Sequence, residues 1–250
     1  MGNINDSYFD GYYKDIWRAI IPPDLTRKEV DFMVRHFGLG SDSKVLDMMC
    51  GYGRHAVALA EKGIAVTAVD NQGEYIDEIR QRALQDSLPV TPIKVDIASY
   101  QSKEQFDLAI CMGNSLNFFS EAEVKKILEN IAAQLKPEGH ILINSWSIAE
   151  IAILQFKDRT WSQVGDIKLI SDSKYLFHPT RIETQSLILL PNGKTESKTA
   201  IDYVFSIAEL NEILRSSGLG MEDVYSIPGK KTFSLGEPRA YIVARKLNRH

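Results

Sequence analysis

The chain has 250 residues, a formal net charge of −4 and a hydrophobic fraction of 44%. This length and composition predict a folded core and exclude a disordered chain, and the acidic balance argues against nucleic acid or an anionic membrane as a partner. Two cysteines, no signal-peptide pattern and no apolar run of membrane-spanning length together predict a cytoplasmic protein. The oligomeric state stays open.

The N-terminal segment is rich in aromatic residues. Residues 6–20 have the spacing of one helix with Asp6 as its N-cap, and Pro22-Pro23 would end it. Thr26-Arg27-Lys28-Glu29 has the pattern of a capping box that opens a second helix through Phe37. The aromatic residues form either a packing face or a lid over a ligand; they are Tyr8, Phe9, Tyr12, Tyr13 and Trp17.

The segment from Lys44 to Ala56 has the pattern of a buried strand, a glycine turn and a helix start. Gly51 and Gly53 allow close approach of a ligand to the backbone. The spacing also matches the dinucleotide fingerprint. A pyrophosphate, however, would lie close to the carboxylate of Asp47, whereas a ligand that carries an ammonium group would be attracted to it.

Strands and helices alternate through the next hundred residues. Buried strands are predicted at 64–70, 92–97, 106–112 and 140–146, and helices at 74–86 and from the capping box at Ser120 to Leu135. This alternation predicts an α/β fold with a doubly wound parallel sheet. Ligands of such sheets lie outside the carboxyl ends of the strands, where Asp47, Asp70 and Asp96 are found.

The first of these motifs resembles that of class I S-adenosylmethionine-dependent methyltransferases, Asp/Glu-x-Gly-x-Gly-x-Gly. Here it runs Asp47-Met48-Met49-Cys50-Gly51-Tyr52-Gly53, with Met49 in place of the first glycine. The resemblance implies that Asp70 accepts the ribose hydroxyls and that Asp96 and Ile97 hold the adenine. The full set of cofactor-binding residues that it implies is Asp47, Cys50, Gly51, Gly53, Arg54, Asp70, Asn71, Asp96, Ile97, Met112 and Gly113.

The loop after the fourth strand indicates the type of acceptor. It lacks the Asn/Asp-Pro-Pro-aromatic tetrad of enzymes that methylate nucleic-acid adenine or glutamine, and Gly113-Asn114-Ser115 is more similar to glycine N-methyltransferase-like enzymes of small molecules. Between residues 158 and 205 the pattern becomes strands separated by turns, with a hairpin at Asn192-Gly193. We therefore expect an antiparallel β cap inserted after strand five.

The remaining residues complete the expected core. Ser206 should cap a helix through Ser217, and strands at 221–227 and 239–246 would complete a seven-stranded Rossmann-like sheet whose last strand is antiparallel. The expected division is a helical lid at 1–40, an S-adenosylmethionine-binding core at 41–150, a substrate cap at 151–205 and the C-terminal part of the core at 206–250.

These patterns favour S-adenosylmethionine-dependent methyl transfer to a nitrogen or oxygen of a small molecule, with S-adenosylhomocysteine as product. The alternatives are an enzyme that uses the same cofactor for non-methylating chemistry and a noncatalytic cofactor-binding protein. Candidate general bases are His178, Tyr12, Tyr13 and His55, and a structural role is the alternative for each. No zinc spacing is present, so we expect no metal. Expected acceptor-binding residues are Tyr8, Trp17, Asn114, Trp146 and Arg181; Arg181 would favour an acceptor with a carboxylate if it faces the pocket.

Overall fold

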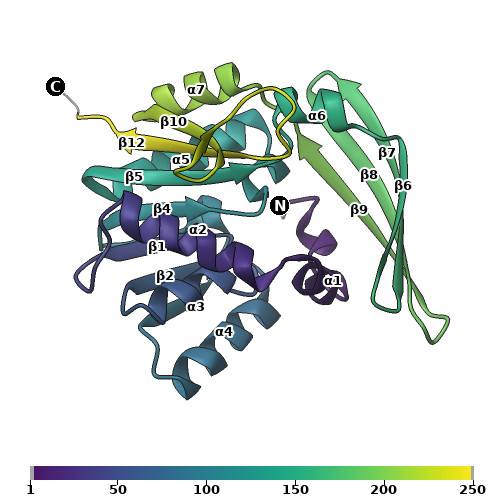
Figure 1. Ribbon diagram of the computed structural model, residues 1–250, viewed down its shortest axis with the longest axis horizontal. Coiled ribbons are helices and arrows are strands. Elements are labelled where there is room, and N and C mark those ends of the chain that lie inside the picture. The colour runs from purple at the N-terminus through teal and green to yellow at the C-terminus, as the bar shows by residue number, and fades with distance from the viewer. Residues whose placement is uncertain (1–2, 249–250) are drawn as a thin grey trace.

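The computed structural model describes residues 3–248, which contain two β-sheets (Figure 1). Within these residues the larger sheet has eight strands in the order β11-β10-β12-β5-β4-β1-β2-β3. Strands β1 to β5 pair in parallel where they are neighbours, and β12 is antiparallel to both β5 and β10. The strands are β1 Lys44–Met48, β2 Ala65–Asp70, β3 Val90–Lys94, β4 Phe106–Cys111, β5 Leu135–Ser145, β10 Leu219–Ile227, β11 Lys231–Thr232 and β12 Ala240–Lys246.

Helices cover both faces of this sheet because both faces are apolar. Successive side chains of a strand point to opposite faces, so Val45 packs in one buried cluster and Leu46 in the other. The cluster around Val45 includes side chains of α2 (Pro23–His36), α3 (Arg54–Ala60) and α4 (Gly73–Gln85). The cluster around Leu46 includes side chains of α5 (Glu121–Gln134), α6 (Ala149–Gln155) and α7 (Ile207–Ser216). The doubly wound Rossmann-like sheet predicted from the sequence is confirmed, with the two-residue β11 added at its edge.

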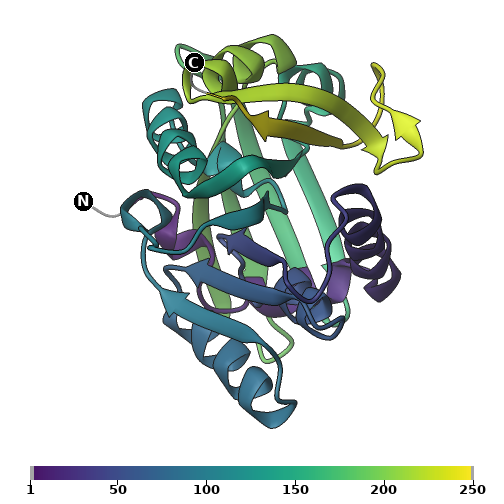
Figure 2. The same cartoon turned by 90° about the vertical axis from the view of Figure 1, so that its left-hand side faces the viewer.

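The smaller sheet is the antiparallel insertion expected after strand five. Its strands pair in chain order: β6 Arg159–Val164, β7 Ile167–Phe177, β8 Thr180–Leu189 and β9 Thr195–Tyr203. The predicted hairpin turn lies between β8 and β9, where Gly193 has a φ of 80°. Figures 1 and 2 show this sheet standing beside the main sheet, with the N-terminal segment between the two.

The N-terminal segment differs from the prediction of one helix over 6–20. It forms a 3-10 turn, η1 (Asp6–Tyr8), and a separate helix, α1 (Tyr13–Ile20). Gly11 divides them because it has a φ of 63°, which a right-handed helix does not allow. A Cβ at Gly11 would also lie 2.3 Å from Oε1 of Glu196 on β9, so the close approach of the second sheet favours glycine at this position.

Two other expected boundaries were wrong. The box Thr26-Glu29 does not open α2, which begins at Pro23; proline suits the first helical position because it has no N–H to satisfy. Strand β3 ends at Lys94, and Asp96 instead caps the 3-10 turn η2 (Ile97–Ser99), where its Oδ1 accepts a hydrogen bond from the Ala98 amide at 2.8 Å. The boxes at Ser120 and Ser206 cap α5 and α7 as predicted. Among the described residues, no helix is both long and apolar enough to span a membrane.

Candidate functional site

A cavity lies at the carboxyl ends of strands β1 to β4. The chain runs outward from β1 through β2 to β3 and returns to β4 on the other side of β1, which makes the space between β1 and β4 the topological switch point. The cavity, here called the strand-end cavity, measures about 1040 Å³ with its open mouth included. Residues from all four strand ends line it, including Asp47, Cys50, Gly51, Arg54, Asp70, Asn71, Asp96, Ile97, Met112 and Gly113.

Asp47 is the most deeply buried of the acidic residues that line this cavity. The residue is 1% exposed, and within residues 3–248 its Oδ2 has no hydrogen-bond partner. Burial raises the pKa of Asp47 to about 7, against the lowering influence of the Arg54 guanidinium. A buried carboxylate oxygen without a partner is costly. The cavity is therefore suited to a ligand that brings a cationic hydrogen-bond donor to Asp47.

Asp70 connects the ends of two strands. Its Oδ2 accepts a hydrogen bond from the amide of Gly51 at 2.8 Å, and its Oδ1 accepts one from the amide of Gln72 at 2.9 Å. Burial raises the pKa of the Asp70 carboxyl, while these backbone donors lower it. Each carboxylate oxygen has two lone pairs, so both retain the capacity to accept from a ligand. Asp70 can therefore hold the loop after β2 through these backbone hydrogen bonds and still accept hydrogen bonds from a ligand.

In the turn after β1, the backbone has a positive φ at the three positions where the methyltransferase motif has glycine. Met49, Gly51 and Gly53 have φ values of 54°, 55° and 77°. Met49 therefore occupies the left-handed region that a glycine would enter without steric cost. Although Met49 stands in place of the motif's first glycine, its backbone keeps the conformation that a glycine would adopt there.

Gly53 does not line the strand-end cavity, contrary to the expectation that it contacts the cofactor. A Cβ on Gly53 would lie 2.6 Å from Cγ1 of Ile79. The glycine therefore permits close packing of α3 against α4. By contrast, Gly51 does line the cavity, and a Cβ built on it meets no described atom within 4 Å.

A buried polar cluster beneath the turn was missed in the sequence. Glu29 is 2% exposed and bonds to Arg54 at 2.7 Å, His55 at 2.9 Å and the Tyr241 hydroxyl at 2.7 Å. Burial opposes ionisation of Glu29, but hydrogen bonds and the charge of Arg54 hold its pKa at about 2. Glu29 lies inside α2, which begins at Pro23, and its carboxylate bonds to this cluster instead of capping the start of the helix.

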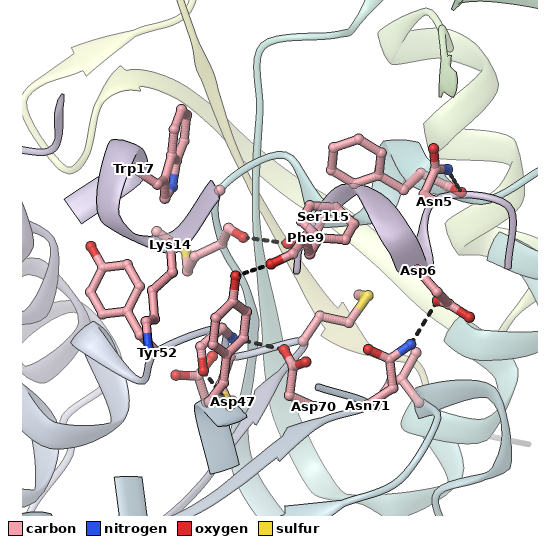
Figure 3. Close-up of a pocket in the computed structure, with 18 of the residues that line it drawn as sticks. Asn5, Asp6, Phe9, Lys14, Trp17, Asp47, Tyr52, Asp70, Asn71 and Ser115 are labelled. Atoms are coloured by element: carbon pink, nitrogen blue, oxygen red, sulfur yellow. Dashed lines mark hydrogen bonds between the residues drawn. The ribbon is translucent and has the colours of Figure 1, made fainter. Parts of the chain in front are cut away.

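The N-terminal segment covers the mouth of the strand-end cavity. Asn71 donates from Nδ2 to Oδ1 of Asp6 at 2.7 Å (Figure 3). Gln72 donates from Nε2 to the Asp6 carbonyl at 2.8 Å. The Tyr75 hydroxyl donates to the carbonyl of Phe9. Figure 3 shows Asp6, Phe9, Lys14 and Trp17 arranged above Asp47 and Asp70. The segment is therefore attached directly to the loop that follows β2.

A second cavity of about 670 Å³, here called the aromatic cavity, lies between the N-terminal segment, the loop after β4 and the smaller sheet. It shares Tyr13, Trp17 and Phe118 with the strand-end cavity, so the two are adjacent. Aromatic rings follow one another along its wall: the centroids of Trp17 and Trp146 are 5.6 Å apart, and those of Tyr13 and Trp17 are 5.9 Å apart. Its remaining lining residues are Tyr8, Ile16, Ile20, Asn114, Leu169, Ser186, Ile188, Lys198 and Asp202.

Asp202 on β9 lines the aromatic cavity and was not identified as a candidate site residue in the sequence. Its Oδ1 accepts hydrogen bonds from Asn114 Nδ2 at 2.9 Å and from Ser147 Oγ at 3.3 Å. Burial raises the pKa of Asp202 to about 6, against the lowering effect of these two donors. The signal in the sequence is the two-residue spacing along this strand, which places Asp202 on the same face as Lys198 and Ala200. The structure shows that Lys198 and Ala200 are buried.

Of the expected acceptor residues, Tyr8, Trp17, Asn114 and Trp146 line the aromatic cavity. The side chain of Asn114 is used within the protein: Oδ1 accepts from the amides of Trp146 and Ser147, and Nδ2 donates to Asp202. Arg181 does not line either cavity. It donates to Glu183 and to the carbonyls of His178 and Pro179, because it belongs to the turn end of the β7–β8 hairpin.

Of the four candidate bases, two lie outside both cavities, one lines the strand-end cavity and one lines both. His178 is exposed between β7 and β8, and Tyr12 is 39% exposed; both lie outside the two cavities. His55 lines the strand-end cavity, but burial lowers its pKa to about 4 and its Nε2 is paired with Glu29. Tyr13 lines both cavities, and burial raises its pKa well above the ordinary value. Only Tyr13 of these four is at the junction of the cavities.

Comparison with known proteins identifies related sequences and folds. A model of the methyltransferase domain matches residues 45–139. YqeM of Bacillus subtilis (strain 168), a methyltransferase by name, is 27% identical over 195 residues, which is 74% of this chain and 77% of the relative. Glycine/sarcosine N-methyltransferase of Halorhodospira halochloris is 27% identical over 143 residues, 56% of this chain and 53% of the relative.

A solved structure has the same fold. CalS10 of Micromonospora echinaspora, an amino pentose methyltransferase solved with S-adenosylmethionine bound, aligns with a TM-score of 0.72. The alignment covers 95% of this chain and 97% of CalS10, at 19% identity. Among residues 3–248, no group of three or more His, Cys, Asp or Glu side chains is placed to hold a metal ion.

Proposed function

Because this chain is a class I S-adenosylmethionine-dependent methyltransferase, we propose that it transfers a methyl group to a nitrogen or oxygen of a small molecule. The observation that carries the proposal is the pair of adjacent cavities, one at the strand ends and one walled by aromatic residues. A small-molecule site is typically concave and largely apolar with a few polar groups, as the aromatic cavity is. The names of a glycine/sarcosine enzyme and an amino pentose enzyme among similar proteins support this acceptor class.

The strand-end cavity has groups that fit three parts of S-adenosylmethionine: its amino group, its ribose and its adenine. The unpartnered Oδ2 of Asp47 suits the amino group, the two oxygens of Asp70 suit the ribose hydroxyls, and Asp96 with Ile97 suits the adenine. Gly51 lets this ligand approach the turn. When bound, S-adenosylmethionine supplies a methyl carbon whose bond to sulfur breaks with both electrons passing to sulfur as the acceptor forms the new bond.

In the proposal, the protein's own contribution is to align the two ligands and exclude water. Residues 1–40 would act as a lid, 41–150 and 206–250 as the cofactor-binding core, and 151–205 as the substrate cap. Tyr13 would donate a hydrogen bond as a neutral phenol to the acceptor, since its raised pKa keeps it protonated. Alignment in a closed site contributes on the order of 7–11 kcal/mol to lowering such barriers.

The proposed acceptor is a small molecule in the cytoplasm and not a polynucleotide. A net charge of −4 gives the chain no overall attraction for a phosphate backbone. The two cysteines are both free, as is usual in a reducing compartment.

The test is a methylation screen over amines, phenols, carboxylates, RNA and peptides, using the full chain and two truncations. Deletion of residues 1–20 removes Tyr8, Tyr13 and Trp17 from the walls of the aromatic cavity, so transfer to a small acceptor should fall on the order of 100-fold. Truncation after Lys246 is the control and should change little. Turnover on RNA or peptides alone, or full activity of the folded deletion variant, would refute the proposal.

A further inference from the structure

Resting on the proposed function, the structure indicates a narrower acceptor class. We propose that the acceptor is an amine, that Asp202 binds its protonated amino group, and that Asp202 then takes the proton that frees the nitrogen lone pair. The sequence had instead suggested a carboxylate-bearing acceptor through Arg181, which the structure places outside the aromatic cavity.

The carboxylate of Asp202 is held with one oxygen fixed and the other left for a ligand. Asn114 and Ser147 both donate to Oδ1, and none of the described residues donates to Oδ2. Asn114 is itself fixed by the amides of Trp146 and Ser147, at 2.9 and 3.0 Å. Asp202 thus lines the aromatic cavity on a rigid support that joins β9 to the ends of β4 and β5.

Asp202 is the charged residue of the aromatic cavity whose charge is not neutralised by a neighbouring described residue. Among the described residues that line the aromatic cavity, the charged ones are Lys198 and Asp202. Lys198 is already neutralised: it contacts Asp10, lies 2.6 Å from Glu196 and donates to the Ser7 carbonyl at 2.9 Å. The cavity therefore has the electrostatics to attract a cation and to disfavour a carboxylate.

The aromatic walls are favourable to the same ligand. Tyr8, Tyr13, Trp17, Phe118 and Trp146 all line the cavity. Ammonium groups are attracted to the faces of aromatic rings, most strongly to tryptophan. Such walls also pack against an apolar framework, so the expected acceptor is an amino group on a small, partly apolar molecule.

The proton step follows from the state in which an amine arrives. An ammonium nitrogen has no lone pair with which to attack a methyl carbon. In the step assigned to Asp202, an N–H bond breaks with its electron pair remaining on nitrogen, and an O–H bond forms at Oδ2. The pKa of Asp202 is raised to about 6 by burial, which makes it a stronger base than an ordinary aspartate.

The titratable groups that face Asp202 are few. Tyr8 and Tyr13 remain neutral because burial raises the pKa of both, that of Tyr8 to about 12. Lys198 stays protonated, since its acidic partners raise its pKa although burial opposes this. Asp47, whose pKa is raised to about 7, lines only the strand-end cavity. In titrations without S-adenosylhomocysteine, loss of amine binding at acid pH can therefore be attributed to protonation of Asp202.

The experiment measures equilibrium binding of three probes of equal framework: cyclohexylamine, cyclohexanol and cyclohexanecarboxylate. The full chain is titrated by calorimetry or ligand-observed NMR, alone and with S-adenosylhomocysteine. We expect the amine to bind at least tenfold more tightly than the alcohol, and the carboxylate to bind more weakly than either. Amine affinity should fall below about pH 6 as Asp202 takes up a proton.

Two variants complete the test. Asp202→Asn should abolish the preference for the amine, while Asp166→Asn, at an exposed site in the turn between β6 and β7, should retain it. If Asp202→Asn does not fold, the pH series on the unaltered chain without S-adenosylhomocysteine decides. Equal binding of amine and alcohol, no detectable amine binding, or a folded Asp202→Asn that keeps the preference would overturn the inference.

Binding also separates this inference from the proposed function. Amine selectivity without methylation of any amine would leave the Asp202 site standing and refute methyl transfer. Methylation of phenols by a chain that does not prefer amines would support methyl transfer and refute the Asp202 site. With a methylated amine in hand, Asp202→Asn should lower kcat more at pH 6.5 than at pH 9, where more of the amine arrives without its proton.

Discussion

The strand-end cavity and the aromatic cavity share a wall but are assembled in different ways. Asp47, Asp70 and Asp96 lie at or just beyond the ends of three successive parallel strands of the main sheet, and each stands within a short local motif. Asp202 and Asn114 are 88 residues apart; Asp202 belongs to β9 of the smaller sheet, and Asn114 to the loop after β4 of the main sheet. A site made from consecutive strand ends depends on topology alone, whereas a site made between sheets depends on how they pack. The two cavities should therefore respond differently to mutation.

The largest effect is expected at the acid of the strand-end cavity. Asp47→Asn removes the charge that would pair with the cofactor's amino group, and loss of one partner of a buried pair costs about 3–5 kcal/mol. Calorimetry should thus show S-adenosylhomocysteine affinity reduced on the order of 100-fold or more. Asp166→Asn should bind normally. An unchanged affinity for the Asp47 variant would place the ligand elsewhere.

The same variant should be more stable than the unaltered chain without cofactor. The pKa of Asp47 is about 7 in the folded state and near the ordinary aspartate value of 3.8 when the chain is unfolded. The folded state therefore binds more protons, and its stability falls as pH rises from about 4 to 7. Asparagine does not titrate and so removes this loss. The melting temperature of Asp47→Asn should therefore exceed that of the unaltered chain at pH 8 but not at pH 4. A lower melting temperature at pH 8 would contradict the assignment.

Cofactor affinity should depend on pH through the same residue. A bound ammonium lowers the pKa of Asp47, so the complex holds fewer protons than the free protein. Affinity for S-adenosylhomocysteine should fall about tenfold for each pH unit below 7 and level off above it. Asp202→Asn should leave this dependence unchanged, because Asp202 lines only the aromatic cavity. A flat profile from pH 5 to 7 would show that Asp47 does not meet a cation.

The two glycines of the turn should separate binding from packing. Gly53→Ala places a Cβ against Ile79 at a φ of 77°, so it should destabilise the fold by at least about 1–2 kcal/mol with nearly unchanged cofactor affinity. Gly51→Ala should reduce affinity, because its Cβ would occupy space beside the ligand. Urea unfolding and calorimetry on both variants provide the measurement. Loss of affinity in a folded Gly53→Ala protein would restore its predicted role at the cofactor.

The smallest effect is expected where the N-terminal segment meets the loop after β2. Asn71→Ala removes one exposed hydrogen bond to Asp6, and the remaining contacts of Gln72 and Tyr75 still hold the segment. A net loss of about 0.5 kcal/mol should raise the KM for S-adenosylmethionine roughly twofold. Asn211→Ala, remote from both cavities, is the matched control. A change of tenfold or more would mean that Asn71 itself holds the cofactor.

The sequence determined the main sheet and the acids at its strand ends. Alternating buried strands and helices require parallel pairing with both faces covered, and the carboxyl ends of such strands meet at one edge. The same local logic located the caps at Ser120 and Ser206 and the hairpin at Asn192-Gly193. In each case, neighbours within a few residues carry the information.

Only the tertiary structure decided the contacts between distant segments. Glu29 matched a capping pattern but is bonded to His55 and Tyr241, because α2 packs against the buried end of β12. Arg181 and His178 belong to the cap, yet the β7–β8 hairpin carries them away from the cavity. The register of β9 against β8, and the packing of that sheet on the loop after β4, bring Asp202 to Asn114. Local periodicity gives the face of a strand, but not what that face will meet.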